Sequence, residues 1–83
     1  MTGPRRRQRD TAVPMPQYAG IGQSILDRRL ALGLTQQGLA DLAGTSRSSV
    51  QALEYGTGSV KLAVLIEVAA VLGLRVDLTG SRD

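Results

Sequence analysis

Side chains that can recognise another molecule by hydrogen bonding are concentrated in one short stretch of the chain, SRSSVQA. An arginine can make a bidentate contact to guanine, a glutamine can pair with adenine, a serine can serve either base, and an alanine methyl can meet that of thymine. On a helix that starts here, these groups would point outward, although such a stretch is also typical of a solvated helix face. The candidate base-reading residues are Ser46, Arg47, Ser48, Gln51 and Ala52.

The composition of the 83-residue chain argues against an enzyme. It contains no His, so the commonest general base near neutral pH is missing, and no Cys, so it has no thiolate nucleophile or thiolate metal ligand. The seven carboxylates are scattered and form no paired motif. We therefore expect neither catalysis nor a metal or cofactor. Phe and Trp are also absent, so the core must be aliphatic.

The net positive charge of the chain comes from its N-terminal end. Residues 1–17 hold four arginines and one aspartate, whereas residues 18–83 hold six cations and six carboxylates. Residues 1–17 also contain all three prolines, which predicts a flexible tail. The cluster Arg5–Arg9 has two open interpretations, an arm that enters the minor groove of DNA and a merely solubilising tail. No signal peptide or membrane-spanning stretch is visible, which indicates a cytoplasmic protein.

Apolar spacing and capping residues predict four helices after this tail. Each predicted helix ends at a glycine, and those glycines are Gly33, Gly44, Gly56 and Gly73. The expected first residues or caps are Tyr18 for the first helix, Thr35 for the second, Thr45 or Ser46 for the third, and Ser59, followed by Val60, for the fourth. We expect residues 18–73 to form one all-α domain.

The C-terminal part of the chain predicts a dimer. The fourth helix is apolar almost all the way round, and so small a domain has too little protein to cover it. Beyond it, Leu74, Val76 and Leu78 alternate with polar residues, which predicts a strand over residues 74–79, followed by a tail at 80–83. A lone strand is stabilised only by pairing. We expect it to pair with its copy in a homodimer.

Residues 28–56, RRLALGLTQQGLADLAGTSRSSVQALEYG, resemble the helix-turn-helix of the lambdoid phage repressor and Cro superfamily. The shared elements are G-L-T-Q, L-A-x-x-A-G, S-x-x-x-V and L-E-x-G at the family's spacing. The resemblance implies a four- to five-helix, lambda-repressor-like DNA-binding domain whose third helix reads base edges in the major groove.

The resemblance also implies roles for residues outside the third helix. Gln36 would bond a backbone phosphate, although it could simply cap its helix. Arg29 and Glu54 would form a structural ion pair between the first and third helices. Family members often contact phosphates in the loop after the third helix, and Lys61 there could equally be a solvated residue. The candidate phosphate contacts are Gln36, Thr57, Ser59 and Lys61.

Within the superfamily the chain is most similar to HipB-type antitoxins, small dimers whose C-terminal strand pairs between subunits. The ending LGLRVDLTG corresponds to that strand. The resemblance implies a repressor of its own operon that also neutralises a HipA-like serine/threonine kinase toxin. Two alternatives stay open, a stand-alone phage-type or metabolic repressor, and an interaction module that has lost DNA readout.

Overall fold

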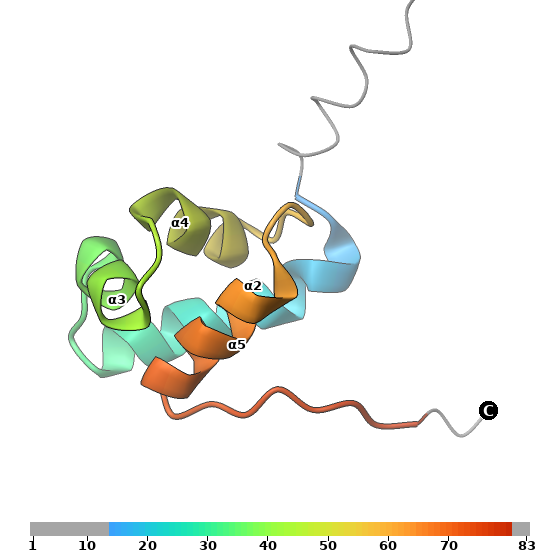
Figure 1. Ribbon diagram of the computed structural model, residues 1–83. Helices are drawn as coiled ribbons and strands as arrows, with labels where there is room; N and C mark the ends of the chain where they lie inside the picture. The colour runs from blue at the N-terminus through green and yellow to red at the C-terminus, as the bar shows by residue number, and fades with distance from the viewer. Residues whose placement is uncertain (1–13, 81–83) are drawn as a thin grey trace, which may run out of the picture.

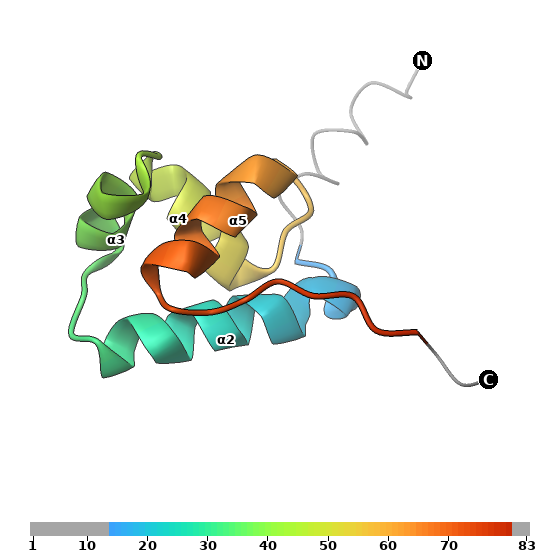
Figure 2. The same ribbon diagram turned by 60° about the horizontal axis from the view of Figure 1, so that its bottom comes forward.

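The computed structural model describes residues 14–80 and places four helices within them (Figures 1 and 2). The predicted arginine cluster Arg5–Arg9 and residues 81–83 lie outside the described part. The helices are α2 (Pro16–Ala31), α3 (Gln36–Ala43), α4 (Arg47–Tyr55) and α5 (Leu62–Val71). None of them is long and apolar enough to cross a membrane.

Capping explains where the two middle helices begin and end. The side chain of Thr35 accepts a hydrogen bond from the backbone N–H of Gly38 at 2.8 Å, and α3 ends at Gly44 with φ of 70°. Ser46, rather than Thr45, caps α4 by accepting from Ser49 N–H at 3.1 Å, and Gly56 ends it with φ of 85°. A positive φ costs glycine little, so these glycines end their helices as predicted.

Two helix starts differ from the sequence expectation. The first helix begins at Pro16 instead of Tyr18, because proline suits the first helical turn and Met15 N–H donates to Gly56 O at 2.9 Å. The last helix begins at Leu62 with Lys61 as its N-cap, so the expected cap at Ser59 is wrong. The hydroxyl of Ser59 lies 3.1 Å from that of Thr57 instead. Residues 59–61 lie outside the helix, and Val60 packs on the core.

The core is aliphatic, as the composition required, and draws on all four helices. Its most deeply buried large side chains are Ile25, Leu39, Val50, Val68 and Leu72. The two helices α2 and α3 both pack against α4, and α5 closes the bundle against α3 (Figures 1 and 2). The helix α4 is therefore held from several sides.

The segment after α5 is extended, but the predicted strand pairing is not formed in the single chain. Within residues 14–80 no strand is formed, and residues 74–80 follow an extended path alongside α2 and α5 (Figure 2). A ladder needs a second backbone, and a single chain supplies none here. Arg28 Nε donates to Leu72 O at 2.8 Å and Gly73 turns the chain with φ of 75°, so the start of the segment is fixed.

Candidate nucleic-acid interface

The helix α4 has one buried side and one polar, exposed side. Val50 and Leu53 are almost completely buried in the core. On the opposite side Arg47, Ser48 and Gln51 are exposed, and Ala52 is half-buried. The i, i+3 spacing of the two apolar residues fixes the rotation of the helix, because only one orientation buries both. The predicted base-reading side chains therefore lie together on one accessible surface.

Ser46 differs from the other predicted base-reading residues, because its hydroxyl is already used. It accepts from Ser49 N–H, donates to Ser49 Oγ at 3.0 Å and lies 3.1 Å from Ser48 Oγ. A hydroxyl has a single proton to donate. The structure therefore gives Ser46 a capping role at the start of α4, although its side chain is exposed.

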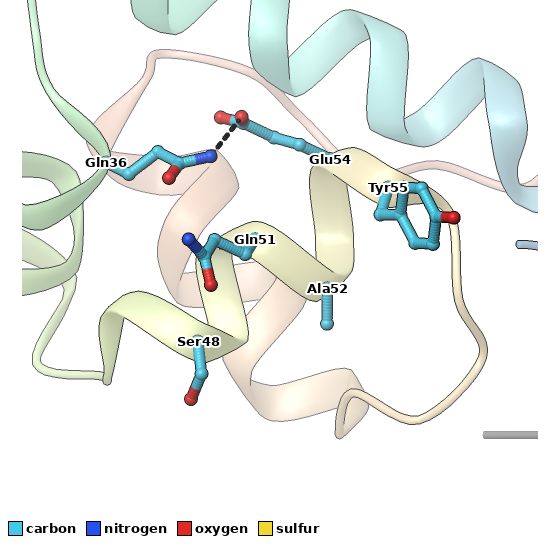
Figure 3. Close-up of a pocket in the computed structure, with 6 residues that line it drawn as sticks. All are labelled: Gln36, Ser48, Gln51, Ala52, Glu54 and Tyr55. Carbon is cyan, nitrogen blue, oxygen red and sulfur yellow. Dashed lines mark hydrogen bonds between the residues drawn. The ribbon is translucent and has the colours of Figure 1, made fainter. Parts of the chain in front are cut away.

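A shallow hollow lies between α3 and α4 on this same side of the molecule (Figure 3). Its lining combines hydrogen-bonding side chains with one aromatic ring, and the residues are Gln36, Ser48, Gln51, Ala52, Glu54 and Tyr55. Gln36 Nε2 donates to Glu54 Oε1 at 3.0 Å, a contact that the sequence did not predict. Gln36 is thereby fixed at the first position of α3, directly beside the exposed side of α4.

Arg29 and Glu54 form the ion pair that the resemblance implied. Arg29 Nε donates to Glu54 Oε2 at 2.6 Å and Arg29 Nη2 to Glu54 Oε1 at 3.1 Å. Arg29 Nη1 also donates to Leu34 O at 2.9 Å. The two side chains are only 11% and 7% exposed. With Gln36 they link α2, α3 and α4, so the orientation of α4 depends on a buried polar network.

A glycine lets α2 approach the C-terminal end of α4. A Cβ atom on Gly22 would lie 2.6 Å from Glu54 O and 2.7 Å from Leu53 O. Real Cβ atoms do not approach carbonyl oxygens so closely, and therefore only glycine fits here. The ion pair and this close packing both act at Glu54 of α4.

The loop after α4 holds three predicted phosphate contacts, and the structure separates them. Thr57 is only 9% exposed, and its hydroxyl donates to Ala52 O at 3.4 Å, so it has a structural role at the end of α4. This use of the Thr57 hydroxyl argues against the predicted phosphate contact, which stays a prediction. Ser59 and Lys61 are exposed.

Tyr55 lies at the end of α4, next to the loop in which the resemblance implied phosphate contacts. This tyrosine is 61% exposed and lines the same hollow as Gln51 (Figure 3). The sequence already indicates that Tyr55 belongs to this surface, because it follows Gln51 by four residues and therefore lies on the same side of a helix.

The predicted dimer-strand residues lie elsewhere, at the end of α5. Leu74 packs partly against the core, Val76 is 43% exposed and Leu78 is 93% exposed. On α5 itself Leu62 and Ile66 are 65% and 48% exposed. These apolar side chains leave part of α5 and of residues 74–78 uncovered in the single chain.

Comparison with known protein families gives one match. A sequence model described as Helix-turn-helix matches residues 25–78, which is more than half of the chain. The matched range contains all of α3, α4 and α5 and the last part of α2, together with the extended residues 74–78. No curated protein matches the chain significantly.

Proposed function

The chain belongs to the helix-turn-helix family of DNA-binding transcription regulators, and we propose that α4 is the helix that reads its operator. The observation that carries this proposal is the exposed side of α4, where Arg47, Ser48 and Gln51 lie on a helix whose other side is buried in the core. The major groove admits one helix, and residues near its N-terminus reach the base edges.

Each exposed residue of α4 has a proposed task. Arg47 donates to O6 and N7 of guanine, Gln51 pairs with adenine, Ser48 bonds either base, and the Ala52 methyl contacts thymine. Ser46 supports them as the N-cap and adds at most an acceptor. Tyr55 extends the surface towards the loop and can bond a phosphate through its hydroxyl.

Phosphate contacts fix the register of the reading helix. The amide of Gln36 has two hydrogens, and one of them is donated to Glu54. The other is available for a phosphate at the N-terminus of α3, where backbone N–H groups favour an anion. Lys61, and to a smaller degree Ser59, would contact phosphates from the loop after α4. Few cations are needed, which agrees with the neutral charge of residues 18–83.

We further propose that the protein binds DNA as a homodimer. The exposed apolar residues Leu62, Ile66 and Leu78, together with Val76, support this proposal, because burying them against a second copy is favourable. A two-fold dimer presents two copies of α4, so its operator would be palindromic with half-sites about 34 Å apart. Such a protein works in the cytoplasm, at the nucleoid.

Footprinting of the DNA upstream of its own gene tests this function. The expected result is a protected palindrome, and Arg47→Ala should lose about 1–3 kcal/mol of binding free energy at one base pair of each half-site and relax specificity there. The Arg47→Ala protein should unfold like the parent, because Arg47 is exposed. A uniform loss on every DNA sequence would make Arg47 a phosphate contact, and no protection at all would remove the DNA-reading function.

The finer proposal is that the protein is an antitoxin of a type II toxin-antitoxin module. The extended ending LGLRVDLTG supports it through its similarity to HipB-type chains, in which a strand occupies this place. The protein would then repress its own operon and neutralise a HipA-like serine/threonine kinase. Co-purification with the product of the adjacent gene is the test. If no kinase gene adjoins this one, the alternative of a stand-alone phage-type or metabolic repressor holds.

A further inference from the structure

The extended residues Leu74–Leu78 carry a pattern of charge that is complementary to itself. Arg75 and Asp77 flank Val76 at equal distance, and Leu74 and Leu78 flank it one step further out. We infer that two copies of this segment pair antiparallel about a two-fold axis at Val76, with Arg75 of each subunit opposite Asp77 of the other. This inference rests on the proposed homodimer and adds its register.

The backbone of the segment presents one edge that is free to pair. Leu74 N–H donates to Ala69 O at 2.8 Å, so this N–H points back to α5. In an extended chain alternate residues point to the same edge, which places the N–H and C=O groups of Arg75 and Asp77 on the opposite edge. In the described part of the chain, the backbone groups of those two residues make no hydrogen bond to other backbone groups, whereas the Asp77 carboxylate accepts from Leu78 N–H at 2.8 Å.

The free edge limits the possible registers. In an antiparallel pair, two residues that face each other across this edge exchange both of their backbone hydrogen bonds. A slip of the pairing by one residue would turn every side chain to the other face and is therefore excluded. Three two-fold registers within Leu74–Leu78 then keep Arg75 and Asp77 on the paired edge. Their two-fold axes lie at Arg75, at Val76 and at Asp77.

Charge distinguishes these three registers. A pair centred on Arg75 puts the two copies of Arg75 opposite each other, and a pair centred on Asp77 does the same with two carboxylates. Like charges directly opposite are destabilising, whereas opposite charges stabilise. Only the register at Val76 gives Arg75 opposite Asp77, and by symmetry it gives this pair twice.

The apolar residues agree with the same register. It places Leu74 opposite Leu78 of the second copy, and Val76 opposite Val76, on the face away from the charged pairs. Hollows lie on both sides of the segment, one towards α2 and one towards Ile66 and Ala70 of α5. A two-stranded ribbon is stable only when it packs on other elements, and these surfaces supply that support.

Charge reversal tests the register in the full chain. We would measure dimer dissociation by sedimentation for the parent, for Arg75→Asp, for Asp77→Arg, and for the protein with both changes. Each single reversal turns both opposite-charge pairs into like-charge pairs and should raise the dimer Kd on the order of 10- to 100-fold at low salt. The double reversal should restore the parent value within about threefold. Asp41→Arg, an equal charge change on exposed α3, is the control.

Mixing the two single variants gives a second measurement. With the register at Val76, both facing pairs of the mixed dimer again have opposite charges, so the mixed dimer should match the parent and associate more tightly than either variant alone. A register centred on Arg75 or on Asp77 would replace a like-charge pair of the parent by an opposite-charge pair, so its mixed dimer would associate more tightly than the parent. If the parent is a dimer and the double variant does not recover its affinity, or the mixture associates more tightly than the parent, the register is wrong while the dimer stands. If the parent sediments as a monomer at every concentration, the proposed dimer itself is overturned.

Discussion

The outward sides of α4 and α5 differ in chemistry although both helices belong to the same small bundle. On α4 the exposed side chains are polar and stand next to a buried ion pair that fixes the helix. On α5 the exposed side chains Leu62 and Ile66 are apolar, and no polar network orients them. The difference supports the two proposed partners, a nucleic acid for α4 and a second copy of the chain for α5.

The two surfaces also differ in how strongly they are coupled to the stability of the bundle. Arg29 and Glu54 couple α4 to α2, and Gly22 lets the same helices touch. Changes in this support should affect stability and DNA binding together. Changes on the exposed side of α5 should weaken association, and through it operator binding, while each monomer stays folded.

The largest expected effect follows from breaking the support of α4. Glu54→Ala leaves Arg29 as an uncompensated buried charge, and we expect the free energy of unfolding to fall by about 3–5 kcal/mol. Urea unfolding followed by circular dichroism measures it. Glu67→Ala, on an exposed position of α5, should change stability by about 0.5 kcal/mol or less. A Glu54→Ala protein as stable as the parent would remove the ion pair from the account.

The next effect tests the apolar side of α5. Ile66→Lys replaces a half-exposed apolar side chain by a charge, and we expect a loss of about 2–3 kcal/mol in dimer free energy with the monomer still folded. Sedimentation measures association. Leu42→Lys, at an α3 residue that is 63% exposed and far from residues 74–78 in the sequence, is the matched control. Equal behaviour of both variants would mean that α5 is not the dimer surface.

A smaller effect is expected where α2 touches α4. Gly22→Ala places a Cβ against two backbone carbonyls, and overpacking of this kind costs about 1–3 kcal/mol. Gly20→Ala in the same helix meets nothing within 4 Å and should stabilise the protein by about 0.5–1 kcal/mol. Thermal unfolding of the two variants compares them directly. The same sign for both would contradict the close approach at Gly22.

The smallest effect concerns Lys61, in the loop after α4 and next to the polar side of that helix. Lys61→Ala should weaken binding to all DNA sequences alike, because a phosphate contact carries no sequence information. The slope of log K against log salt should become less negative by about 0.9 for each Lys61 that contacts a phosphate. An unchanged slope would make Lys61 a solvated residue. The same titration on a protein without residues 1–10 tests the arginine cluster.

Much of the fold could be predicted from local signals. Glycines at helix ends and the caps Thr35 and Ser46 act within a few residues of themselves, so the sequence contains them directly. The predicted cap at Ser59 was wrong because its surroundings are set by contacts outside the local sequence. Its hydroxyl is close to that of Thr57, and the position of the loop is set by packing of Val60 on the core, which no local pattern records.

The residues alone determined an aliphatic four-helix domain, the polar outward side of α4 and the self-complementary charges around Val76, because these features are matters of composition and period. Tertiary structure decided which polar groups are already in use. It assigned Ser46 to a cap, buried Thr57 and joined Gln36 to Glu54, since hydrogen bonds between distant segments depend on how the helices pack. It also left residues 74–80 extended and unpaired, because one chain cannot provide the second strand.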